Sequence, residues 1–246
     1  LNEFNNIKKG LDGENEIAYQ LKKANLGLYV LRDVKVKYED LTAQIDYVVV
    51  TPVFIYYIEC KNLYGNIIVD EKGDFIREFV YNGKKVKKGM YSPLRQVEAQ
   101  REVIRKIWES KISSFKKIMA SKNFDYYRRV LVVAANKDTI LNTSKAPKNV
   151  KNKILRADSL IRQIKCDLDN IDNNDYIESQ SEVERTAKSY MDICINNEFD
   201  YYKYYKDKYC NDIEENNKIL KKKLVEFRKN RSKMMNLPAY YIFTNE

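Results

Sequence analysis

Residues 44–61 read Q-I-D-Y-V-V-V-T-P-V-F-I-Y-Y-I-E-C-K, and this stretch decides the fold of the chain. It contains two runs of β-branched and aromatic residues, a composition typical of β-strands. Thr51-Pro52 separates the two runs and provides a turn signal. The stretch therefore predicts a β-hairpin.

The register of this hairpin brings two carboxylates together. If Val50 pairs with Ile55, antiparallel pairing places Asp46 directly opposite Glu59. Side chains alternate along a strand, so Lys61 lies on the same face as Glu59. Two acids and one lysine are therefore expected to converge on one point.

Charges gathered in this way need compensation. Opposed like charges weaken a sheet, and charges within apolar strands are costly unless they are paired or bind a metal. Asp46, Glu59 and the main-chain carbonyl of Cys60 offer hard oxygen ligands for Mg²⁺ (or Mn²⁺), and Lys61 can contact a phosphate or the attacking water. These residues predict a phosphodiesterase centre. The alternative is an exposed salt bridge between Glu59 and Lys61, worth about 0–1 kcal/mol and without functional meaning.

Composition limits the classes of function. The 246 residues, 44% of them hydrophobic, are enough for one or two domains. Lys and Arg number 45 and Asp and Glu number 35, so the net charge of +10 favours a polyanionic partner such as nucleic acid. The chain contains no histidine, which excludes Ser-His-Asp triads, Cys-His nucleophiles and histidine-ligated metal sites.

The cysteines and the apolar runs indicate the compartment. The four cysteines are widely spaced, without a C-x-x-C pair or a secretory signal, so we expect reduced thiols and a cytoplasmic protein. The longest apolar run, residues 47–58, is too short to span a bilayer and contains Pro52. The chain begins at Leu1 rather than Met, which suggests incomplete ends.

A helix is predicted over residues 10–26, where apolar residues recur at helical spacing and Gly27 is a suitable stop. Glu14 lies on the apolar stripe with Ile17 and Leu21, so we expect its carboxylate to face the sheet. The alternative is that Glu14 belongs to a fraying first turn, where the helix dipole favours an acid.

Further strands are predicted at residues 28–36, 67–69 and 75–81, the last followed by the hairpin turn Asn82-Gly83. A lysine cluster comes directly after this turn, and it reads either as a solvated loop or as a contact for a phosphate backbone. The cluster consists of Lys84, Lys85, Lys87 and Lys88.

The second part of the predicted domain contains two helices and a strand. Ser92-Pro93 is an N-cap signal for a long helix that carries Gln96, Arg101 and Arg105 on its polar side. Residues 129–135 predict a buried strand and residues 154–164 a short helix. Strands and helices together indicate an α/β fold.

The composition changes near residue 168, where we place a domain boundary. Residues 169–217 predict a helical linker or extension. Within it, residues 199–209 interleave aromatic residues with lysines, which favours either stacking on unpaired bases or an amphipathic packing helix.

Four segments, in this order, resemble the nuclease-related domain (NERD) family of the PD-(D/E)XK restriction-endonuclease-like superfamily. Residues 10–14 (G-L-D-G-E) are similar to its opening helix motif and residues 44–50 to its aspartate strand. Residues 58–65 (I-E-C-K-N-L-Y-G) are similar to its E-x-K strand, and residues 92–96 (S-P-L-R-Q) to a later N-P-x-x-Q element, with Ser in place of Asn. The resemblance implies a restriction-endonuclease-like mixed sheet flanked by helices, in a domain over residues 1–168.

The resemblance also implies roles for individual residues. In this superfamily two strand carboxylates bind a divalent metal, the lysine assists the attacking water, and a helix glutamate completes the site. By similarity these catalytic roles fall to Asp46, Glu59, Lys61 and Glu14. Gln44 and Gln96 are candidates for positioning.

A second resemblance concerns the end of the chain. Residues 218–246 are similar to the start of an HRDC domain, the helicase-and-RNase-D C-terminal module, on the basis of Arg228 and residues 238–243. The remaining helices of that module are absent, so we expect the natural protein to continue past Glu246.

These observations predict a divalent-metal-dependent nuclease that hydrolyses phosphodiester bonds, with DNA as the expected partner. One alternative is a non-catalytic nucleic-acid-binding module, because a fold can persist after its chemistry is lost. Another is a scaffold that binds acidic proteins, which rests on net charge only.

Overall fold

The computed structural model describes residues 2–113, 123–195, 222, 225–226 and 230. The chain separates into two compact units, Leu1–Asn196 and Asn197–Glu246. The stretch 199–209 lies outside the described residues, as does nearly all of the HRDC-like stretch 218–246, of which the four described residues are helical.

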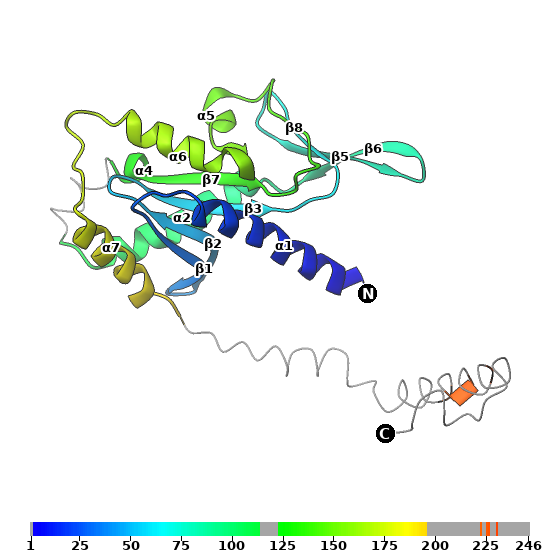
Figure 1. Cartoon of the computed structure of the whole chain (residues 1–246), viewed down its shortest axis with the longest axis horizontal. Helices are drawn as coiled ribbons and strands as arrows, with labels where there is room; N and C mark the ends of the chain where they lie inside the picture. The colour runs from blue at the N-terminus through cyan, green and yellow to red at the C-terminus, as the bar shows by residue number, and fades with distance from the viewer. Residues whose placement is uncertain (1, 114–122, 196–221, 223–224, 227–229, 231–246) are drawn as a thin grey trace. The chain divides into compact units, whose positions relative to one another are not determined.

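A five-stranded mixed sheet forms the centre of the first unit (Figure 1). Its strands, in spatial order, are β1 (Tyr29–Tyr38), β2 (Leu41–Val50), β3 (Ile55–Lys61), β7 (Arg128–Ala134) and β9 (Ile154–Arg156). β2 pairs antiparallel with both β1 and β3, whereas β7 pairs parallel with both β3 and β9. The predicted α/β class, a mixed sheet flanked by helices, is confirmed.

The central hairpin has the predicted register. Val50 pairs with Ile55, and the ladder continues to the pair of Tyr47 and Ile58. Thr51 closes the turn, because its hydroxyl donates to the carbonyl of Phe54 (2.7 Å) and accepts from the Phe54 N–H (3.0 Å). The side-chain hydroxyl therefore satisfies main-chain groups that a buried turn would otherwise leave without partners.

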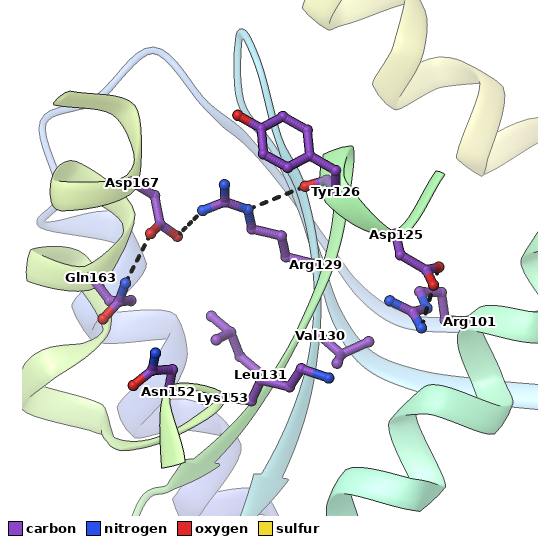
Figure 2. A pocket seen from close by; sticks show the side chains of 10 residues that line it. All are labelled: Arg101, Asp125, Tyr126, Arg129, Val130, Leu131, Asn152, Lys153, Gln163 and Asp167. Atoms are coloured by element: carbon purple, nitrogen blue, oxygen red, sulfur yellow. Dashed lines mark hydrogen bonds and ion pairs between the residues drawn. The ribbon is translucent and has the colours of Figure 1, made fainter. Parts of the chain in front are cut away.

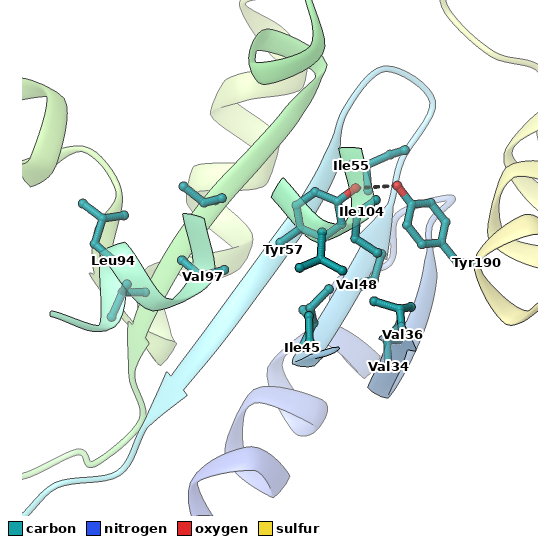
Figure 3. Close-up of a cluster of buried hydrophobic side chains, with 14 of the residues drawn as sticks. Val34, Val36, Ile45, Val48, Ile55, Tyr57, Leu94, Val97, Ile104 and Tyr190 are labelled. Atoms are coloured by element: carbon teal, nitrogen blue, oxygen red, sulfur yellow. Dashed lines mark hydrogen bonds between the residues drawn. The ribbon is translucent and has the colours of Figure 1, made fainter. Parts of the chain in front are cut away.

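Helices cover both faces of this sheet. Helices α1 (Asn2–Lys22) and α6 (Leu160–Asp169) pack on the face that carries Tyr56 and Ile58. Helices α2 (Pro93–Ser110) and α7 (Gln180–Asp192) pack on the face that carries Val48 and Tyr57, and Figure 3 shows this second core. The short elements are α4 (Phe124–Tyr127), α5 (Lys148–Lys151) and the 3₁₀ turn η1 (Ala157–Ser159).

A second, smaller sheet stands beside the first, in the order β6-β5-β4-β8. Its strands are β4 (Asn66–Val69), β5 (Phe75–Tyr81), β6 (Lys84–Met90) and β8 (Leu141–Asn142). The predicted turn joins β5 to β6, with φ of 49° at Asn82 and 73° at Gly83, as a tight hairpin turn requires. The lysine cluster forms the edge strand β6, so the prediction of a loop was wrong.

Helix α1 is longer and earlier than predicted. It begins at Asn2 and ends at Lys22, after which Asn25 adopts a left-handed φ of 47°. Glu14 therefore lies in the middle of the helix. The alternative that placed it in a fraying first turn is wrong.

Two further predictions need correction. Residues 154–156, predicted as helix, form β9, because this short apolar segment pairs with the buried strand β7, and α6 begins only at Leu160. Arg101, predicted on the polar side of α2, is buried, because its guanidinium reaches the carbonyl of Arg128 (3.2 Å) and the carboxylate of Asp125 (3.3 Å).

Helix α7 belongs to the first unit, which extends beyond the boundary predicted near residue 168. Its residues Val183, Ala187 and Tyr190 are buried in the core of Figure 3. The hydroxyls of Tyr190 and Tyr57 form a hydrogen bond of 2.6 Å. Among the described residues, no helix has the length and apolar character needed to cross a membrane.

We expect Tyr190→Ala to lower the free energy of unfolding by about 3–5 kcal/mol, as for other buried aromatic residues. Met191→Ala, at the exposed next position of the same helix, is the matched control and should change stability by less than about 0.5 kcal/mol. Urea unfolding followed by fluorescence of the single tryptophan, Trp108 on α2, measures this unit. Equal stabilities of the two variants would show that α7 does not contribute to the core.

Candidate functional site

The carboxylates of Asp46 and Glu59 lie where the ladder between β2 and β3 ends. Tyr47 and Ile58 form the last ladder pair. One residue further on, the main-chain N–H of Cys60 donates to Oδ2 of Asp46 at 2.7 Å. Asp46 is partly buried and Glu59 is only 3% exposed. Asp46 and Glu59 thus lie one position beyond the last ladder pair, where the Asp46 side chain, in place of a strand carbonyl, accepts the Cys60 N–H.

A change in strand alternation places Asp46 at this point. Ile45 and Val48 both pack in the core beneath α2, although odd and even positions of a regular strand face opposite ways. The side-chain alternation of β2 is therefore interrupted between these two residues. On β1, the register neighbour Asp33 has a left-handed φ of 54°, and the ladder omits this pair. The distortion coincides with the point at which Asp46 accepts from the Cys60 N–H.

Lys61 connects the sheet to α2. Its Nζ lies 2.5 Å from Oε1 of Glu59 and donates to Oε1 of Gln96 at 3.2 Å. Gln96 occupies the first turns of α2, whose start is held by Ser92, since the Ser92 hydroxyl accepts from the N–H of Arg95. The Glu59 side chain is only 4% exposed, so this ion pair is not the exposed surface salt bridge considered as an alternative.

Gln100 is a site residue that the sequence analysis missed. It is 9% exposed, and its Nε2 donates to the carbonyl of Gln44 (2.6 Å) and more weakly to Oε2 of Glu59 (3.4 Å). These two acceptors determine the orientation of the amide. Its Oε1 is buried without a hydrogen-bond partner in the described part of the chain. The signal for Gln100 was its position four residues after Gln96, on the same helix face.

The electrostatic environment of Asp46 is unusual. Burial, and secondarily the charge of Glu59, raises its pKa from 3.8 to about 7, although the hydrogen bond from Cys60 acts in the opposite direction. Burial and the neighbouring carboxylates also raise the pKa of the Cys60 thiol, which makes this thiol unreactive.

The Glu14 carboxylate is held by Arg32 and not by the residues of this centre. It accepts from Arg32 on β1 at 2.8 Å, on the sheet face opposite α2. The main chain of α1 is nevertheless tied to the site, since the Tyr47 hydroxyl donates to the Glu14 carbonyl at 2.7 Å. The Glu14 charge contributes, as a minor cause, to the raised pKa of Asp46.

The close packing of α1 on the end of β3 explains why the residue before Glu14 is a glycine. A Cβ at Gly13 would lie 2.5 Å from Cβ of Asn62, directly after β3. Glycine therefore lets α1 approach the end of β3 closely. Of the other predicted positioning residues, Gln44 directs its amide away, to Asp33 at 2.7 Å.

The donor set suits a hard divalent cation. Asp46 and Glu59 contribute carboxylate oxygens at one end of the sheet, and Mg²⁺ in proteins is commonly held by one or two carboxylates together with water and substrate phosphate. A cation between them would relieve the repulsion that helps to raise the pKa of Asp46. Within the described residues, no group of three or more acidic, cysteine or histidine side chains is arranged to hold a metal. The residues thus fit an ion that shares its remaining coordination with solvent or substrate.

The lysines of β6 lie outside this centre. All four are exposed, and their alternation along the strand divides them between the two faces of the small sheet. Lys87 makes a long ion pair with Glu78 on β5 (3.7 Å). They form a basic edge rather than part of the carboxylate site.

A pocket of about 640 Å³ lies elsewhere, beside the start of β7 (Figure 2). Its charged groups neutralise one another: Arg129 pairs with Asp167 at 2.8 Å and Arg101 with Asp125 at 3.3 Å. Parallel pairing sets the start of β7 beside Ile55 and its end beside Lys61. The pocket is therefore at the opposite end of β3 from the carboxylates, and we assign it no part in their chemistry.

Replacement of Asp46 should change the pH dependence of stability. Because folding raises its pKa, Asp46 stabilises the fold when protonated, and this contribution is complete below pH 3.8 and lost as the pH rises through about 7. Asp46→Asn keeps an acceptor for the Cys60 N–H and remains neutral. Its melting temperature should therefore exceed that of the parent by an amount that grows between about pH 4 and 7, measured without divalent ions.

Asp12→Asn, at an exposed position of α1, is the matched control for this measurement. A difference in melting temperature between Asp46→Asn and the parent that stays the same from pH 4 to 8 would contradict the assigned burial of Asp46.

Comparison with known protein families identifies one family. The sequence model of the nuclease-related domain matches residues 9–135, more than half of the chain, and this segment contains all the carboxylate-site residues described above. No curated protein and no solved structure is significantly similar to the chain. The chain belongs to the nuclease-related domain (NERD) family, whose function relates to nucleic acid.

Proposed function

We propose that this protein is a Mg²⁺-dependent nuclease that hydrolyses phosphodiester bonds in DNA. The observation that carries the proposal is the position of Lys61, which is held between Glu59 and Gln96 beside the buried carboxylate of Asp46. A lysine and two carboxylates at one edge of a sheet are the groups that metal-assisted phosphodiester hydrolysis needs. Membership of the nuclease-related family supports the same function.

Asp46, Glu59 and the carbonyl of Cys60 are the residues proposed to hold the ion. Bound there, Mg²⁺ or Mn²⁺ supplies Lewis-acid activation of the phosphate and of a water molecule. Glu14 can join these ligands only if its carboxylate leaves Arg32, to which it is bonded at 2.8 Å.

Lys61 is proposed to position the attacking water or a phosphate oxygen. An ammonium group has three N–H donors. Two of them point to Glu59 and Gln96, so one remains for a ligand. Gln100 supports this arrangement indirectly, because it holds the second oxygen of Glu59 and the main chain of Gln44.

The test of this function is cleavage of linear and circular DNA by the purified protein with Mg²⁺ or Mn²⁺, and with EDTA. Lys61→Met should abolish cleavage and keep DNA affinity, because one lysine among 45 basic residues contributes little to electrostatic binding. Lys165→Met, at an exposed position of α6, is the control and should cut DNA like the parent.

Three results would contradict the proposal. Cleavage that persists in EDTA would exclude a metal-dependent reaction. Loss of DNA affinity in Lys61→Met would show that the lysine is a binding residue. DNA binding without cleavage under any of these conditions would support the non-catalytic binding module instead.

Replacement of all four β6 lysines by glutamine should have the reverse effect. Affinity for DNA should fall and become less dependent on salt, because each lost phosphate contact lowers the slope of log K against log salt by about 0.9 on duplex DNA. Cleavage at saturating DNA should be retained, since these side chains are not in the carboxylate site. A charge-matched variant replaces four exposed lysines elsewhere, namely Lys22, Lys23, Lys111 and Lys165. An equal loss of slope in both variants would mean that the β6 lysines have no special contact.

A further inference from the structure

A pocket of about 820 Å³ opens beside Asp46, between the start of β2 and helix α2. We call it the β2–α2 pocket. Its size lies within the range of about 300–1,000 Å³ that is common for small-molecule sites. It shares Asp46, Gln96 and Gln100 with the carboxylate site, so a ligand in the pocket would be continuous with a phosphate at that site.

Much of the lining is apolar, and part of it is freely exposed. The apolar and aromatic lining residues are Leu41, Ala43, Tyr91, Ala99 and Val103. Tyr91 is 77% exposed and Leu41 is 44% exposed, although both are large. An exposed tyrosine directly before the Ser92 cap of α2 is available for stacking.

The charge of the pocket argues against a site for the phosphate backbone. The charged lining residues are Asp46, Glu102 and Lys106, two acids and one base. Affinity for a backbone comes from several basic groups that replace counterions. A nucleic acid that enters this pocket must therefore be held by contacts of its bases.

Gln100 provides a second, independent indication of a ligand. It lines the pocket, it is about nine-tenths buried, and its Oε1 has no partner among the described residues. A buried acceptor without a partner costs free energy. Oε1 is covered in this structure, so a ligand in the pocket reaches it only when the amide rotates. Nucleobases carry N–H donors of the kind it needs on their edges.

We propose that the β2–α2 pocket receives an unpaired base adjacent to the scissile phosphate, with stacking on Tyr91, so that the substrate is single-stranded nucleic acid. In a duplex the faces of the bases are covered by their neighbours, whereas an unpaired base offers its π-face to an aromatic side chain. This inference rests on the proposed function, because it assigns the substrate class of the same site.

Binding of a fluorescent single-stranded DNA and of the matching duplex, measured by anisotropy in EDTA at one salt concentration, tests the inference. The parent should bind the single strand more tightly than the duplex. Tyr91→Ala should weaken single-strand binding about 5- to 150-fold, the effect of removing one stacking aromatic residue. Tyr91→Phe should retain it, and duplex binding should not change. Tyr176→Ala, at another exposed tyrosine, is the matched control.

A second variant tests the pocket without Tyr91. Ala99 is exposed on α2 and lines the pocket, so Ala99→Trp should fill it and weaken single-strand binding in the same selective way. The inference is overturned if the parent binds duplex more tightly than the single strand. It is also overturned if Tyr91→Ala and Ala99→Trp leave single-strand binding unchanged, or if they weaken single-strand and duplex binding equally.

Cleavage of the same two ligands with Mg²⁺ separates this inference from the proposed function. Selective, Tyr91-dependent binding of the single strand without any cleavage would remove the proposed chemistry and leave the pocket assignment in place. The opposite result is also possible to recognise. If Lys61→Met abolishes cleavage, while the parent and Tyr91→Ala both cut duplex and single strand equally well, the proposed chemistry stands and the pocket assignment falls.

Discussion

The hydrogen bond from the main-chain N–H of Cys60 to the carboxylate of Asp46 holds the end of the central hairpin, and the site depends on it. At this point the side-chain alternation of β2 is shifted by one residue. The Asp46 side chain therefore accepts the Cys60 N–H, which a strand carbonyl would otherwise accept. The bond brings Asp46 close enough to Glu59 for their charges to repel. Their proximity and burial together raise the pKa of Asp46. A geometric irregularity in one strand is thus the origin of the site's electrostatics.

Stability alone does not explain why charged groups are retained here. A buried ion pair such as Glu59 and Lys61 commonly stabilises a fold no more than apolar residues of similar size would. The surrounding structure nevertheless holds these groups in defined positions, through Gln96 and Gln100 on α2 and through the close approach of α1 at Gly13. Such support of charged groups by neighbouring elements is typical of a site whose geometry matters for binding or chemistry.

The molecule separates two kinds of surface that a nucleic acid can use. The β2–α2 pocket is partly apolar, carries little net charge and is continuous with the carboxylates, whereas the lysines of β6 form an exposed basic edge on the other sheet. Lysines on an edge strand also have a structural effect, because they oppose pairing with the edge of another molecule. Charge on β6 and stacking in the pocket therefore act on different parts of a ligand, the backbone and the bases.

The sequence by itself determined the elements whose signals are local. The hairpin register followed from the turn at Thr51-Pro52, and the start of α2 from the Ser92 cap. Only the tertiary structure decided that Glu14 bonds to Arg32, that Gln100 holds Glu59, that residues 154–156 join β7, and that Tyr190 meets Tyr57. These contacts join residues that are distant in the chain, and they depend on where each helix crosses the sheet. Periodicity tells which face of a helix is apolar, but the partner on the other side is selected by packing.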